Sequence, residues 1–271
     1  MLRSIKDLRG YAIEATDGNI GHVKDFYFDD ERWAVRYLIV EAGSWLVSRK
    51  VLISPFALGT PNWTTKTLPA NLTREQVKNS PNIDTEKPIS RQHEDDYLRY
   101  YNYPNYWGGA GLWGVGIYPE AMMQGYVNNT IPQDTRSRGE SFTDARQIDD
   151  DRHRNDDVHL RSCHEIIGYH LCANDGDIGH VTDMLVDDRT WAIRYLIVDT
   201  VEWWFGHRVL IAPQWISDVQ WLEHQVTVDL DLQEVKNSPL YDPNVLMDRK
   251  FELETHQHYL REGYWLHEEC E

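Results

Sequence analysis

Hydrophobic and polar positions alternate over short stretches along most of the chain, which is the pattern of half-buried β-strands. The alternation is clear at residues 22–29. Residues 33–40 form a continuous run rich in β-branched and aromatic side chains, and we expect the central strand there. Further strands are expected at residues 11–15, 51–53 and 63–68.

Turn and helix signals separate these strands. Asp17-Gly18 predicts a hairpin turn, because glycine readily adopts the positive φ that such turns need. Residues 29–32 predict a second turn, and residues 72–78 predict a short helix that ends before Pro81. Five or six short strands with one short helix predict a small closed or nearly closed β-barrel, which would leave no unpaired edge strand.

The same pattern occurs twice in the chain. Residues 15–41 align with residues 173–199 without a gap, at an offset of 158. The offset still holds at the sequence VKNSP, which occupies residues 77–81 and 235–239. The repeat is therefore about 75–80 residues long, a size at which a domain folds alone but with little stability to spare.

The segments between and after the repeats differ from them in composition. We expect a mainly β protein with five segments: a barrel repeat at 1–81, a helical and aromatic arm at 82–107, a flexible glycine-rich and acidic linker at 108–160, a second barrel repeat at 161–239 and a second arm at 240–271. The arms align at residues 97–99 and 259–261 if a four-residue shift is allowed. Each arm is expected either to cover one end of its barrel or to pack on the other barrel or a second chain.

The repeated motif resembles the PRC-barrel domain. It reads DGxIGxVxDxxxDDxxWxxRYLIV, followed by RKVLISP in the first copy and HRVLIAP in the second. The resemblance implies a six-stranded barrel and a role in protein–protein contacts. The tandem form resembles a bacterial subgroup without an assigned function. The family includes the photosynthetic reaction centre H subunit and the ribosome-maturation factor RimM, but we expect neither role, since the membrane helix of the first and the amino-terminal domain of the second are not found in this sequence.

The net charge of the chain limits the classes of molecule that we expect it to bind. The net charge is −17, which argues against binding of nucleic acid, because phosphates are neutralised by Lys and Arg. The charge is also divided unevenly. Residues 1–80 hold 11 basic and 9 acidic side chains, whereas residues 161–239 hold 5 basic and 13 acidic ones. Copies that face different partners, or each other, would diverge in this way.

Three sets of side chains were considered for chemistry. The first is acidic: Asp17, Asp25, Asp29 and Asp30 with their copies Asp175, Asp183, Asp187 and Asp188. The others are the repeated histidines His22 and His180, and the set Cys163, His164, Cys172, His267 and Cys270. Aspartates are common in turns, no nucleophile motif accompanies the histidines, and the cysteine spacing matches no zinc finger. We therefore predict no catalytic, cofactor or metal site, and three cysteines suit a reducing compartment.

Aromatic side chains are the remaining signal, since Trp and Tyr are enriched at interface centres. Trp45 and Trp203 fall in a loop between strands, where an interface anchor is more plausible than a core position. Two histidines at equivalent repeat positions would make a contact between them sensitive to pH. The candidate interface residues are Trp45, Trp203, Trp204, His22, His180, Tyr106, Trp107, Tyr264 and Trp265.

These observations predict a non-enzymatic protein that mediates protein–protein assembly, with another protein or a second copy of the chain as partner and no cofactor. Two alternatives stay open: a peripheral subunit or assembly factor of a membrane complex, and a binder of a small molecule or metal in a cleft between barrels. No run of 18 apolar residues is present, so we expect a cytoplasmic protein with no inserted segment. Contact with the inner membrane would need a protein partner, because anionic lipid repels this charge.

Overall fold

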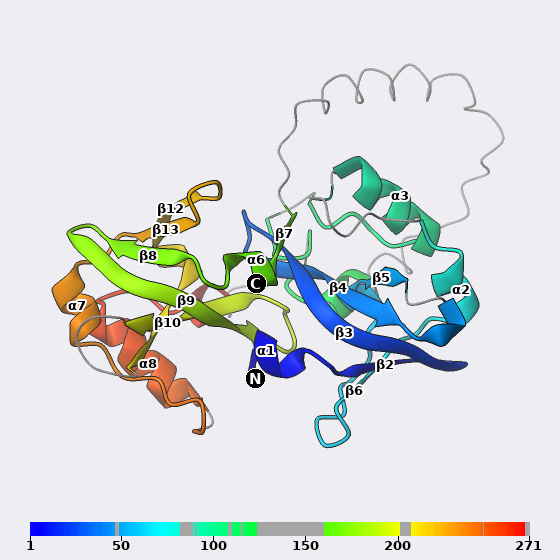
Figure 1. Cartoon of the computed structure of the whole chain (residues 1–271), viewed down its shortest axis with the longest axis horizontal. Helices are drawn as coiled ribbons and strands as arrows, with labels where there is room; N and C mark the ends of the chain where they lie inside the picture. Colours follow the sequence, from blue (N-terminus) through cyan, green and yellow to red (C-terminus); the bar gives the residue numbers. More distant parts are fainter. Residues whose placement is uncertain are drawn as a thin grey trace, which may run out of the picture. The chain divides into compact units, whose positions relative to one another are not determined.

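The computed structural model describes residues 1–46, 49–81, 89, 91–107, 110–114, 116–123, 160–200, 207–245 and 247–268. The chain is mainly β and forms two compact units (Figure 1). The first-repeat unit comprises Tyr11–Arg32 and Arg36–Arg161. The second-repeat unit comprises Met1–Gly10, Trp33–Val35 and Ser162–Glu271. Each unit therefore combines residues from both repeats.

The first-repeat unit is built on a six-stranded mixed sheet. Its strands are β2 (Ala12–Ala15), β3 (Gly18–Asp29), β4 (Ala34–Ala42), β5 (Lys50–Ile53), β6 (Thr67–Pro69) and β7 (Leu160–Ser162). The order is β5-β4-β3-β2-β6, and β7 also pairs with β3. Strands β2 and β6 are parallel, whereas β2–β3 and β4–β5 are antiparallel. The expected central strand is confirmed as β4, which is buried along nearly its whole length.

The second-repeat unit repeats this arrangement in a seven-stranded sheet. Its strands are β1 (Leu2–Ser4), β8 (His170–Ala173), β9 (Gly176–Asp187), β10 (Ile193–Thr200), β11 (Arg208–Ile211), β12 (Ile216–Gln220) and β13 (Gln225–Val228). The order is β11-β10-β9-β8-β13-β12, and β1 also pairs with β9. Strands β8 and β13 are parallel, as their counterparts β2 and β6 are.

Neither sheet closes into the expected barrel, because among the described strands the two at the ends of each sheet do not pair with each other. In the first-repeat unit a helix, α3 (Arg91–Tyr101), contacts the end strand β5 instead. The Tyr97 hydroxyl donates to the Leu52 carbonyl oxygen at 3.0 Å and accepts from the Ser54 amide at 3.2 Å. This side chain therefore satisfies two backbone groups at the carboxyl end of β5.

The other helices whose bounds are established in the described residues are short. They are α1 (Ile5–Leu8), α2 (Arg74–Lys78), α6 (Cys163–Ile166), α7 (Leu232–Lys236), α8 (Arg249–His258) and α9 (Trp265–Glu268), with 3-10 turns η1 (Ser44–Leu46), η2 (Pro55–Ala57) and η3 (Pro213–Trp215). The predicted helix near residue 75 is confirmed as α2. It begins with a capping box, in which Thr73 and Gln76 each satisfy a backbone amide of the other.

The strand expected at residues 63–68 is shorter than predicted. The Asn62 side-chain oxygen accepts from the amides of Thr64 and Thr65, both at 3.1 Å, which holds this stretch in a turn. Lys66 then adopts a left-handed φ of 55°, and β6 begins only after it. Polar side chains that bond to nearby backbone therefore override the strand preference here.

The second glycine of the DGxIG motif is fixed by a close approach between β3 and β4. A Cβ atom on Gly21 would lie 1.9 Å from the Glu41 carbonyl oxygen. A Cβ atom on Gly179 would lie 2.0 Å from the Asp199 carbonyl oxygen in the other repeat. Only glycine fits at this position, which explains why the motif is kept in both copies.

The structural repeat is longer than the sequence analysis expected. Among the described residues of the first repeat, the left-handed non-glycine residues are Trp33, Lys66 and Asn102, and they recur 158 positions later as Trp191, His224 and Leu260. The last pair lies within the arms, where a four-residue shift was expected. That shift is wrong, because helices α3 and α8 are each followed by a left-handed residue, Asn102 and Leu260, and these two residues are 158 positions apart. Each helix packs within the unit of its own repeat.

The glycine-rich segment that follows the first arm is not wholly a linker. Trp113 is fully buried in the first-repeat unit and lies 4.9 Å from the ring of Phe56. Backbone hydrogen bonds join Gly111 to Gly114 at 2.8 Å and Trp113 to Gly116 at 2.7 Å. The glycines permit this tight backbone approach, so they serve packing around Trp113 rather than flexibility. Most of the expected linker, residues 124–159, lies outside the described residues.

The two repeats exchange their first strands, which the sequence analysis did not predict. Strand β1 pairs antiparallel with β9 of the second repeat, and β7 pairs with β3 of the first. Both exchanged strands read Leu-Arg-Ser. Arg3 bonds to Asp188 at 3.3 Å, and its counterpart Arg161 bonds to Asp30 at 3.2 Å. Each unit is therefore completed by a strand from the opposite repeat.

Candidate interaction site

The arm of the first repeat buries a carboxylate beneath helix α3. Glu94 is 1% exposed and accepts hydrogen bonds from the hydroxyls of Tyr37 and Tyr106. Burial, reinforced by the nearby Glu94 carboxylate, raises the pKa of both tyrosines well above its usual value. The tyrosines therefore remain protonated donors, and the carboxylate is satisfied within the core.

The second repeat has an equivalent cluster with one further member. Glu252 Oε2 accepts from Tyr264 at 2.7 Å and from Tyr195 at 3.3 Å. The hydroxyl of Tyr195 also lies 3.0 Å from Nε2 of His256, whose Nδ1 lies 2.9 Å from the Glu262 carbonyl oxygen. Burial lowers the pKa of His256, so the ring is held neutral.

Buried arginines flank these clusters. Arg36 forms an ion pair with Asp29 at 3.1 Å, donates to the Leu112 carbonyl oxygen at 2.8 Å and lies over the Tyr106 ring at 4.0 Å. Its counterpart Arg194 lies 3.9 Å from the centre of the Tyr264 ring. These contacts compensate the cost of burying the charges. The clusters therefore hold each arm on its own sheet.

The acidic residues considered for metal binding have other roles. Asp17 Oδ1 accepts from the Arg74 amide at 2.8 Å, and Asp175 Oδ1 accepts from the Leu232 amide at 2.8 Å. Asp183 bonds to Ser4 of the exchanged strand, and burial raises the pKa of this carboxyl. Among the described residues, no three histidine, cysteine or acidic side chains are arranged to hold a metal ion. His267 and Cys270 lie outside the side chains that the structure describes.

The two candidate histidines lie in different surroundings. His22 is exposed and stands opposite Ala12 on the neighbouring strand. His180 is half-buried and stands opposite His170, with the ring centres 4.4 Å apart. His170 also lies 3.9 Å from Asp177. The histidine pair is thus a feature of the second repeat alone.

Most of the candidate aromatic residues serve the fold. Tyr106 and Tyr264 are buried core residues rather than exposed anchors, because each donates to the carboxylate of its own arm. Trp107 and Trp265 are half-buried and pack edge-on against these tyrosines at 5.0 and 5.1 Å. The interface role predicted for these four residues stays a prediction.

Trp45 is similarly engaged within its own unit. Its indole nitrogen donates to the Ile20 carbonyl oxygen at 2.9 Å, and the Arg74 guanidinium lies 4.4 Å from its ring centre. The ring is half-buried, so only part of it faces solvent. The other predicted loop tryptophans, Trp203 and Trp204, lie outside the described residues.

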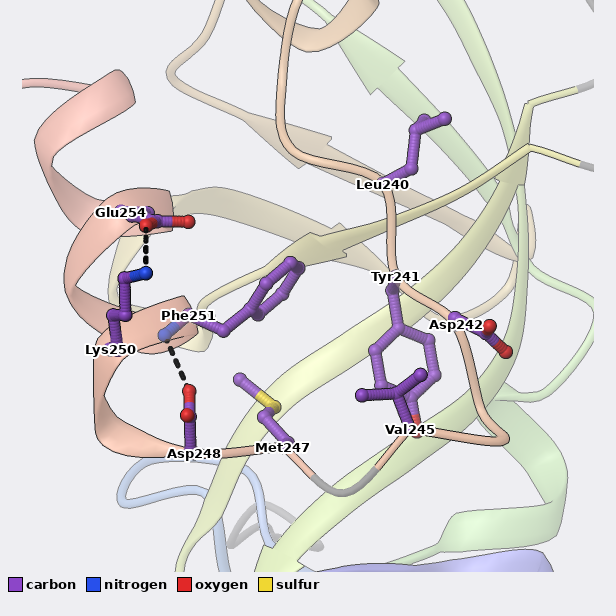
Figure 2. Close-up of a pocket in the computed structure, with 9 residues that line it drawn as sticks. All are labelled: Leu240, Tyr241, Asp242, Val245, Met247, Asp248, Lys250, Phe251 and Glu254. Atoms are coloured by element: carbon purple, nitrogen blue, oxygen red, sulfur yellow. Dashed lines mark hydrogen bonds and ion pairs between the residues drawn. The ribbon is translucent and has the colours of Figure 1, made fainter.

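The structure instead contains a surface hollow that the sequence analysis missed. The α8 groove has a volume of about 300 Å³ and lies between helix α8 and the loop before it (Figure 2). Its lining residues are Leu240, Tyr241, Asp242, Val245, Met247, Asp248, Lys250, Phe251 and Glu254. Val245 is 63% exposed and Leu240 is 50% exposed. The sequence does carry a signal for this groove. Several apolar residues lie outside any strand pattern in the stretch 240–271, which was predicted to be an arm.

Local hydrogen bonds hold the shape of the α8 groove. The Tyr241 amide donates to the Arg208 carbonyl oxygen at 2.8 Å, which fixes the loop to β11. Asp242 Oδ1 accepts from the Asn244 amide at 2.9 Å, and Asp248 Oδ1 accepts from the Phe251 amide at 2.9 Å. The second of these bonds caps helix α8. The groove is therefore formed before any partner arrives, which lowers the entropic cost of binding.

Comparisons with known proteins assign one domain. Residues 2–57 match the PRC-barrel domain. This match begins in the exchanged strand β1 and ends in η2 of the first repeat. No curated protein matches the chain. In the part of the chain that the structure describes, no helix is both long and apolar enough to cross a membrane.

Proposed function

We propose that this protein is a non-catalytic PRC-barrel protein that binds another protein through the second-repeat unit. The observation that carries this proposal is the α8 groove, a preformed surface hollow with apolar side chains exposed to solvent. Exposed apolar patches of this kind are typical of binding sites. The PRC-barrel match is consistent with it, since this domain suggests an interaction module.

The buried polar groups give further support. Among the described residues of the arm helices, the buried carboxylates are those of Glu94 and Glu252. Each accepts hydrogen bonds from tyrosine hydroxyls. Catalytic acids and bases need access to a substrate. Carboxylates that are buried and accept hydrogen bonds from tyrosine hydroxyls stabilise the fold instead, which favours a binding role over a chemical one.

Site-specific photo-crosslinking in cells that produce the full chain tests this proposal. A photoreactive amino acid at Val245 should give a covalent adduct with a specific protein. The same amino acid at Leu222, which is 97% exposed in a turn outside the groove, is the matched control and should not. The proposal is contradicted if Val245 gives no protein adduct, or if both positions give the same adducts.

A further inference from the structure

The α8 groove lies in a stretch where the two repeats differ in sequence. At an offset of 158, the arm residues Glu252, Tyr264 and Trp265 have identical counterparts in the first repeat. Of the nine groove residues only Asp242 has an identical counterpart, Asp84. Leu240, Val245 and Phe251 correspond to Asn82, Lys87 and His93. The apolar lining is therefore only partly shared, since these three residues are polar or charged in the first repeat whereas Tyr241 and Met247 correspond to Ile83 and Ile89.

The rim of the groove is acidic. Asp242, Asp248 and Glu254 contribute three carboxylates, and Lys250 contributes one ammonium group, which lies 3.8 Å from Glu254 (Figure 2). Lys250 is 81% exposed, so this pair neutralises the rim only weakly. Apolar side chains at the centre with carboxylates at the edge favour a ligand that has the complementary arrangement.

We infer that the α8 groove binds a short segment of a partner protein in which apolar side chains lie between lysines or arginines. This inference rests on the proposed function and adds the chemistry of the partner. The apolar side chains enter the hollow, whose volume of about 300 Å³ lies at the lower end for ligand pockets. The flanking basic residues meet Asp242, Asp248 and Glu254. The net charge of −17 on the whole chain speeds the approach of such a segment.

A labelled peptide on the full-length chain tests the inference. The probe is Gly-Lys-Lys-Phe-Leu-Lys-Lys-Gly, and binding is followed by fluorescence anisotropy. One control peptide has Glu in place of Lys, and a second has Ser-Ser in place of Phe-Leu. We expect both controls to bind at least tenfold more weakly than the probe. Equal binding of the acidic control, or of the Ser-Ser control, would overturn the inference.

Variants of the protein locate the site. The triple variant Leu240→Asn, Val245→Lys and Phe251→His installs the residues of the first repeat and should weaken probe binding at least tenfold. The exposed pair Asp242→Asn and Glu254→Gln should weaken binding about threefold to tenfold, and added salt should reduce that difference. Leu222→Thr, which installs the first-repeat residue Thr64, should leave binding unchanged. Circular dichroism confirms that each variant is folded.

Three outcomes separate this inference from the proposed function. Unchanged probe binding by folded groove variants would place the peptide elsewhere and overturn the inference. Self-association that the triple variant abolishes would identify a second copy as the occupant and also overturn it. A photo-crosslinked partner at Val245 whose docking segment is acidic or wholly polar would overturn the inference while leaving the proposed function standing.

Discussion

Arg3 and Asp188 are 185 residues apart in sequence, yet the Arg3 Nε atom lies 3.3 Å from Asp188 Oδ2. The amino-terminal nitrogen of Met1 bonds to the same carboxylate at 2.6 Å. The counterpart pair, Arg161 and Asp30, lies 3.2 Å apart in the first-repeat unit. The two contacts have the same cause, because each repeat supplies its first strand to the sheet of the other. We therefore expect neither repeat to be complete when produced alone.

Glu94→Ala should destabilise the first-repeat unit by about 2–4 kcal/mol, because it leaves the buried hydroxyls of Tyr37 and Tyr106 without their acceptor. Denaturant unfolding measures the loss, and hydrogen exchange assigns it to that unit. Glu94→Gln is the control, since its amide keeps one acceptor oxygen and should cost less. Equal stability of Glu94→Ala and the natural chain would show that the cluster contributes nothing to stability.

Leu260→Asn should stabilise the protein by about 0.5–1 kcal/mol. Leu260 has a left-handed φ of 52° and is 91% exposed, so the substitution relieves backbone strain and sacrifices little packing. The first repeat already has asparagine at this position, with a φ of 55° at Asn102. The reverse change, Asn102→Leu, should destabilise by a similar amount. Thermal unfolding of both variants measures these two changes in stability. Melting temperatures that move in the same direction would contradict the explanation.

The second-repeat unit should lose stability as the pH falls from about 7 to 5. Burial lowers the pKa of His256 in the folded state below the ordinary histidine value of about 6.5. The unfolded chain therefore binds the proton more tightly than the folded chain does, and acid favours unfolding. His256 contacts Tyr195, Trp215 and Trp265, and the Arg249 charge opposes protonation further.

His256→Leu installs the residue found at Leu98 in the first repeat and should flatten this pH dependence. Unfolding free energies of both proteins between pH 5 and 8 provide the comparison. The natural chain and the variant should differ in slope below about pH 7 and run parallel near pH 8. Parallel curves over the whole range would exclude His256 as the source.

The strands were largely predictable because their signals are local. The run from Ala34 to Val40 is apolar except for Arg36, and it is buried as β4. Asp17 and Gly18 mark the turn between β2 and β3 locally, and the Asp17 carboxylate also accepts from the distant Arg74 amide. Strand exchange was not predictable, because the Leu-Arg-Ser segments are identical and pair equally well, by sequence, with either repeat. Only the whole fold decides which partner each segment takes.

The arms and the site were predicted less well, for a related reason. Tyr106 and Tyr264 resemble interface anchors in sequence. Each is instead a core residue whose hydroxyl donates to a carboxylate 12 residues earlier, on α3 or α8. The α8 groove arises from residues 240–254, whose apolar side chains follow neither a strand nor a complete helix pattern. Long-range packing decides which aromatic residues are core and which apolar residues stay exposed.

Disulfide formation between designed cysteines tests the strand exchange most directly. Arg3 lies opposite Val186 in the register of β1 and β9, a separation at which a disulfide forms readily. Phe28 is the residue equivalent to Val186 in the first repeat and is the matched control. After oxidation, peptide mapping of the monomer should show a bond in Arg3→Cys/Val186→Cys and none in Arg3→Cys/Phe28→Cys. A bond in the second variant and none in the first would show that each repeat keeps its own first strand.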